Sequence, residues 1–150
     1  MNCCTSYNGF KKEPTHHSQL QDEEFLESFE KGILEPSLFT HEAHLRLAWL
    51  YLQHNAKEKA IVKTCQGIKA FDIMHGKGDK YHVTITVASV HIVEHFRQKS
   101  TANNFNEFIM EFPVLTSDFK SLLGRHYTYD VFLDEVAKQS YVAATGEPFF

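Results

Sequence analysis

The segment from Leu45 to Leu52 constrains the fold of this chain more than any other, because seven of its eight residues are apolar. Placed on a helix, such a run is apolar on nearly every side, and a helix of this kind is surrounded by other elements of the protein. Thr40, a favourable N-cap residue, precedes the run. The segment therefore predicts a central, buried helix that begins near Thr40.

Apolar residues at helical spacing predict further helices on both sides of this segment. The next helix is expected to begin at Asn55, which forms a capping-box pattern with Glu58. Asp79 is the expected cap of the following one, whose β-branched run Val83–Val87 could also be read as a strand. The helical period continues to Phe96, too far for a strand. The predicted ranges are about 22–32, 55–75, 80–98, 105–112, 118–123 and 129–140.

These ranges predict an all-α protein, a single-domain helical bundle of four main helices plus shorter C-terminal helices. At 150 residues, of which 43% are hydrophobic, the chain can form one domain with a substantial core. Residues 1–19 are polar and lack apolar periodicity, so we expect a flexible leader in which His16 and His17 are solvated. The helical domain is expected to cover residues 20–150.

Charge and composition exclude several classes of function. The net charge is −4 and no stripe of Lys or Arg is present, so we expect no nucleic acid partner. No apolar stretch is long enough to span a bilayer and no secretory signal is recognisable, so we expect no membrane partner and a cytoplasmic location. The three cysteines, of which Cys3 and Cys4 are adjacent, do not form a disulfide framework.

Histidines supply the strongest indication of chemistry. His41 and His44 are three residues apart on the predicted central helix, which directs both imidazoles to one side, as chelation of an ion requires. In an up-down-up-down bundle the start of the fourth helix, with His82, lies at the same end. Three neutral imidazoles with an open position are typical of a catalytic metal site. We expect a divalent ion, and the ligands do not choose among Zn, Fe, Ni and Cu.

Nearby residues are candidates for the catalytic steps at such a site. Glu42 and Glu30 are candidates for proton transfer, and Tyr81 for orienting the reacting groups. A simpler interpretation stays open, in which first-turn histidines are hydrogen-bonding or capping groups. The His91-x-x-Glu94-His95 spelling of inverted zinc peptidases is better explained as a solvated polar helix face, because no third ligand is evident.

Two phrases give the chain a resemblance to a family of small, uncharacterised bacterial proteins. They are the run from Phe39 to Trp49, with a Thr-His-x-x-His-Leu-x-x-Ala pattern, and Tyr81-His-x-Thr-x-Thr86. The resemblance covers about residues 25–135 and implies roles for His41, His44, His82, Thr84 and Thr86, without a known reaction. Val83 occupies a position that is acidic in some relatives, so no acid–base role is expected there.

Two hypotheses of function follow. The first is a small metalloprotein, favoured as a metal-dependent enzyme that acts on a small-molecule substrate. The second is a non-enzymatic helical module that binds a small apolar ligand or a partner protein; it draws on the aromatic residues and would be supported by an exposed stripe of Phe105, Phe108 and Phe112. The sequence determines neither the substrate nor the oligomeric state.

Overall fold

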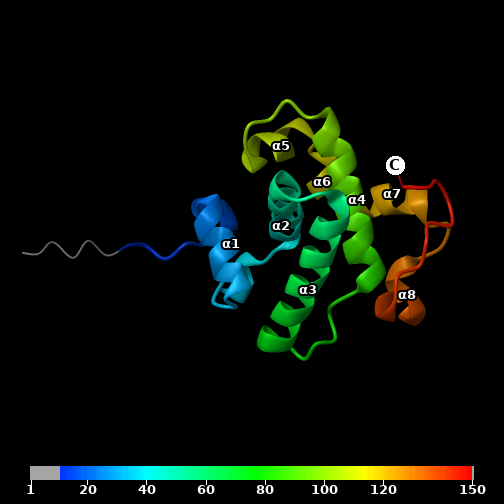
Figure 1. The fold of residues 1–150 in the computed structure, drawn as a ribbon, viewed down its shortest axis with the longest axis horizontal. Coiled ribbons are helices and arrows are strands. Elements are labelled where there is room, and N and C mark those ends of the chain that lie inside the picture. Colours follow the sequence, from blue (N-terminus) through cyan, green and yellow to red (C-terminus); the bar gives the residue numbers. More distant parts are fainter. Residues whose placement is uncertain (1–10, 150) are drawn as a thin grey trace, which may run out of the picture.

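The computed structural model describes residues 11–149, and every regular element in this range is a helix (Figure 1). The all-α prediction is confirmed. The first ten residues of the expected leader, including Cys3 and Cys4, lie outside the described residues. The α-helices are α1 Asp22–Glu30, α2 His41–His54, α3 Lys57–His75, α4 Val83–Lys99, α5 Phe105–Glu111, α6 Val114–Ser117, α7 Phe119–His126 and α8 Glu135–Gln139. Three short 3-10 helices are η1 His17–Gln19, η2 Pro36–Leu38 and η3 Val131–Leu133.

α2 is the central helix, as its apolar run predicts. Its N-terminus is capped by Thr40, whose hydroxyl accepts a hydrogen bond from the amide of Ala43 at 3.3 Å. All residues from Leu45 to Leu52 are buried. α2, α3 and α4 pack against one another pairwise, with α1 on one side of this group and α7 and α8 on the other (Figure 1).

The segment that could also be read as a strand is the long helix α4, but two of the predicted caps are wrong. Asp72 accepts hydrogen bonds from the amides of Lys80 and Tyr81, both at 2.8 Å, which keeps the chain extended as far as His82. His82 then caps α4 in place of Asp79. Asn55 donates to the carbonyl of Tyr51 at 2.9 Å instead of capping α3, because the end of α2 also needs partners.

α1 packs closely on α3 at Gly67. A Cβ atom added to Gly67 would lie 2.8 Å from the ring of Phe29, so only glycine allows this approach. The Phe29 ring is itself fixed between Phe39 and Phe71, with ring centroids 4.8 and 5.3 Å away. The ring therefore has little freedom to move, and the short α1 helix is held by aromatic packing.

The C-terminal segment lies along α4 and covers part of it. Thr84 is fully buried; its hydroxyl donates to the carbonyl of Ser140 and accepts from the amide of Val142, both at 3.0 Å. Further along α4, the His91 ring stacks on Phe149 with centroids 4.8 Å apart. The expected solvated face at His91 is wrong for this residue, because Phe149 covers its ring.

The aromatic residues of α5 bear on the second hypothesis of function. Phe105 and Phe108 are 5% and 0% exposed, so they belong to the core and do not form an exposed stripe with Phe112. The second hypothesis loses this support. Within residues 11–149, no helix combines the length and apolar character needed to cross a membrane.

Candidate metal centre

The described end of the expected leader is packed against the bundle. His17 lies in η1 and is only 1% exposed, so the expectation that it is solvated is wrong. His16 remains exposed, and its Nδ1 caps η1 by accepting from the amide of Ser18 at 3.2 Å. The segment is ordered because a charged residue of α2 binds its backbone.

That residue is Arg46, the single charged side chain in the apolar run of α2. Its guanidinium donates to the carbonyls of His17 at 2.6 Å and Leu20 at 2.7 Å. It also pairs with Asp22 at 2.8 Å and lies 4.6 Å from the ring centroid of Phe25. A buried guanidinium needs several acceptors, and here the N-terminal segment supplies them.

The same interactions fix the His17 ring between Arg46 and Glu42. Glu42 Oε1 lies 3.0 Å from Nε2, and Arg46 Nη1 lies 3.4 Å from Nδ1. Because a guanidinium can only donate, Nδ1 accepts and the ring proton resides on Nε2, from which it is donated to Glu42. Burial lowers the pKa of His17, as do the neighbouring His16 and Arg46, while Glu42 opposes them. The imidazole is therefore neutral at pH 7, the form that binds metals.

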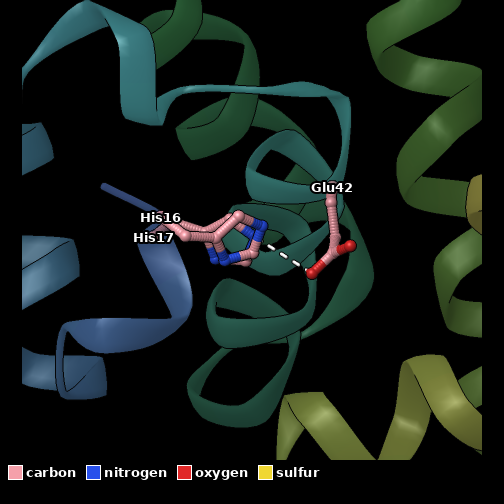
Figure 2. A group of neighbouring side chains, drawn as sticks. All are labelled: His16, His17 and Glu42. Atoms are coloured by element: carbon pink, nitrogen blue, oxygen red, sulfur yellow. Dashed lines mark hydrogen bonds and ion pairs between the residues drawn. The ribbon is translucent and has the colours of Figure 1, made fainter. Parts of the chain in front are cut away.

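His16, His17 and Glu42 form a cluster that could hold a metal ion (Figure 2). The two rings extend from the N-terminal segment toward Glu42 in the first turn of α2. One ligand atom from each residue lies within 4.8 Å of the others, and among residues 11–149 this is the only such group of three or more His, Cys, Asp or Glu residues. We call these residues the His16–Glu42 cluster.

The cluster opens on a cavity of about 300 Å³. His17 and Glu42 form part of its wall together with Arg46, Asn104 and Asn106. The Glu42 side chain is 30% exposed, so a ligand in the cavity could reach it. The wall is mainly polar, which suits a small polar molecule better than a hydrocarbon.

His41 and His44 line a different cavity, together with Thr86. His41 Nε2 donates to the carbonyl of Leu115 at 3.0 Å, and His44 Nδ1 donates to the carbonyl of Thr40 at 2.6 Å. Each ring therefore keeps one nitrogen, Nδ1 of His41 and Nε2 of His44, with a lone pair.

His82 uses both of its ring nitrogens within the protein. Nδ1 accepts from the amide of Ile85 at 3.2 Å, and Nε2 donates to the carbonyl of Val131 at 3.0 Å. These bonds cap α4 and attach η3 to it. In this conformation His82 has no free lone pair for an ion, and the site formed by His41, His44 and His82 stays a prediction.

The three candidate catalytic residues lie in separate places. Glu42 belongs to the cluster, whereas Glu30 accepts from the hydroxyl of Tyr51 at 2.9 Å. Tyr81 lies beside Cys65, and burial together with their hydrogen bond raises the pKa of Tyr81. Of the three, only Glu42 lies in a group of side chains that could bind an ion, together with His16 and His17.

Burial lowers the pKa of several histidines. It is the largest cause of a lowered pKa in each case, so these rings favour the neutral form. The residues are His17, His44, His82, His91 and His95.

Sequence reasoning missed His16 and His17, although a signal was present. A lone arginine in an apolar helical run must find buried acceptors, and the segment that supplies them must be ordered. Arg46 thus indicated that residues outside the predicted bundle pack on α2, without identifying which residues.

Comparison of the chain with protein-family models, curated proteins and solved structures gives no match.

Proposed function

We propose that the protein binds one divalent transition-metal ion at the His16–Glu42 cluster and presents it to a small polar molecule in the adjoining cavity, as a metal-dependent enzyme. The observation that carries the proposal is the approach of three ligand atoms to within 4.8 Å of one another. The 3.0 Å between His17 Nε2 and Glu42 Oε1 fits two atoms that share an ion at about 2.0–2.2 Å each.

The donor set suits such an ion. Two imidazoles and one carboxylate bind zinc in hydrolytic enzymes and ferrous iron in oxygenases, and they leave positions for water or substrate. When bound, the ion would polarise a substrate or lower the pKa of a bound water molecule. The negative charge of Glu42 offsets the positive end of the α2 dipole, which by itself disfavours a cation.

Binding at His17 Nε2 requires the ring proton to reside on Nδ1. There it faces Arg46 Nη1, whose 3.4 Å contact with the ring would change from attractive to repulsive. That contact is the longest hydrogen bond of the guanidinium, and the bonds to the carbonyls of His17 and Leu20 are unaffected by it. The bound form therefore loses the attraction of this one long contact, while the carbonyl bonds continue to hold the segment.

The test is a zinc titration of untagged, chelator-treated protein by calorimetry. We expect one ion per chain, and at least about tenfold weaker binding in Glu42→Gln and His16→Asn. Both substitutions conserve structural roles: glutamine still accepts from His17, and asparagine still caps η1. His54→Ala, which removes an exposed histidine at the other end of α2, is the matched control.

The same titration distinguishes the two candidate sites. His44→Ala and His82→Ala leave binding unchanged if the cluster is the site. Loss of binding in these two variants, with normal binding in Glu42→Gln, would instead support the site of three imidazoles that the spacing of His41, His44 and His82 predicts. Unchanged affinity in both Glu42→Gln and His16→Asn refutes the proposal and leaves the cluster as a purely structural contact.

A further inference from the structure

A second cavity, of about 320 Å³, lies between the starts of α2, α4 and α7 and the middle of α3. Its apolar wall consists of Ala48, Ile68, Ile85, Phe119 and Phe132. Its polar wall consists of His41, His44, Thr64, Thr86 and Ser89. The volume suits a molecule of one or two rings, and the hydrogen bonds of the polar wall determine which kind.

All three hydroxyl groups in this wall donate to backbone carbonyls four residues earlier in the chain. Thr64 donates to the carbonyl of Ala60 at 2.7 Å, and Ser89 donates to the carbonyl of Ile85 at 2.7 Å. Thr86 donates to the carbonyl of His82 at 2.8 Å. A hydroxyl has one proton, so each oxygen can only accept from a ligand in the cavity.

The two imidazoles behave in the same way. Both donate to backbone carbonyls, His41 through Nε2 and His44 through Nδ1, and the second nitrogen of each ring is left to accept. The five polar side chains of the wall therefore offer acceptors and no free donor.

The surroundings of the cavity disfavour a cation through charge and an anion through the lack of hydrogen-bond donors. No Asp, Glu, Lys or Arg is among the described residues that line it. It faces the positive ends of three helices, and Lys120 Nζ lies 5.7 Å from the ring centroid of Phe132, so a cation is repelled. An anion would meet a wall of acceptors.

We propose that this cavity is a binding site for an uncharged, ring-containing small molecule that donates a hydrogen bond through N–H or O–H to the acceptor wall. The ring packs against Phe119 and Phe132, and the donor reaches the free nitrogen of His44 or a neighbouring hydroxyl oxygen. The site is independent of the metal proposal, since it shares no lining residue with the His16–Glu42 cluster.

The test compares indole with benzothiophene, which has nearly the same shape but no donor. Chemical-shift titrations of the wild-type protein are expected to show indole binding about threefold to tenfold more tightly, the contribution of one hydrogen bond. Quinoline, which has an acceptor in place of the donor, and the benzylammonium cation are expected to bind more weakly than indole.

Variants then identify the acceptor wall. His44→Phe retains the ring that stacks on Phe39 but removes the acceptor, and Ser89→Ala removes another. In at least one of the two we expect the preference for indole over benzothiophene to disappear while benzothiophene affinity stays the same. His54→Phe, at an exposed position, is the matched control.

Three results would overturn the proposal. The first is no saturable binding of indole, and the second is equal or tighter binding of benzothiophene, quinoline or benzylammonium by the wild-type protein. The third is an indole preference that persists in both His44→Phe and Ser89→Ala.

Discussion

Arg46 is the residue on which the position of His16 and His17 depends, and replacing it with leucine gives the sharpest test of that dependence. The substitution removes bonds to two carbonyls and to Asp22. The Asp22 side chain is 44% exposed, so its ion pair contributes at most about 1 kcal/mol. Each carbonyl bond from a charged donor contributes about 1.5–3 kcal/mol, part of which is recovered when water reaches the carbonyls. We expect a loss of about 3–5 kcal/mol in the free energy of unfolding.

The assay is equilibrium urea unfolding of metal-free protein, followed by far-UV circular dichroism and by the fluorescence of Trp49, the only tryptophan. Asp22→Asn is the control and should cost less than about 1 kcal/mol, because it removes only the exposed ion pair. Arg46→Lys should fall between the two, since an ammonium group cannot reproduce the fork of the guanidinium. If Arg46→Leu lies within 1 kcal/mol of the wild type, Arg46 does not hold the segment as described.

Three further predictions concern stability. Gly67→Ala should destabilise the folded protein by about 1 kcal/mol, because crowding against Phe29 exceeds the gain in helix propensity. Gly124→Ala, with open space around it, should stabilise the folded protein by about 0.5–1 kcal/mol. Equal urea midpoints for the two variants would contradict this prediction. Thr84→Val should cost about 2–4 kcal/mol and speed hydrogen exchange of the Val142 amide, and unchanged exchange would disprove the attachment. Folding lowers the pKa of histidines such as His44, so the unfolded chain binds more protons than the folded protein below about pH 6.5. The urea midpoint should therefore be constant above that pH and fall below it. A flat midpoint from pH 7.5 to 5.5 would argue against the burial of these histidines.

Helices could be predicted from the sequence where the apolar pattern with helical spacing was long. The apolar run of α2 and the repeat that continues to Phe96 are strong signals because burial of a helical face requires them. Caps were harder to predict: His82 replaces Asp79 only because Asp72, several residues earlier on α3, binds the amides of Lys80 and Tyr81. That choice depends on tertiary contacts that local sequence does not contain.

The site was predicted less completely for a similar reason. The sequence indicated the start of α2 as a place where histidines meet acidic residues, and Glu42 lies in the cluster. The other two candidate metal ligands are His16 and His17, which lie outside any apolar helical pattern and are held in place by Arg46. His82 shows the converse, since a histidine at a helix start serves as a cap when backbone groups lack other partners.

Anomalous X-ray diffraction from crystals of the untagged protein with zinc, recorded above and below the zinc absorption edge, tests the proposed metal centre most directly. We expect one strong peak about 2.0–2.2 Å from ring nitrogens of His16 and His17 and from a carboxylate oxygen of Glu42. A peak between His41 and His44 instead, or no peak near Glu42 at saturating zinc, would contradict it.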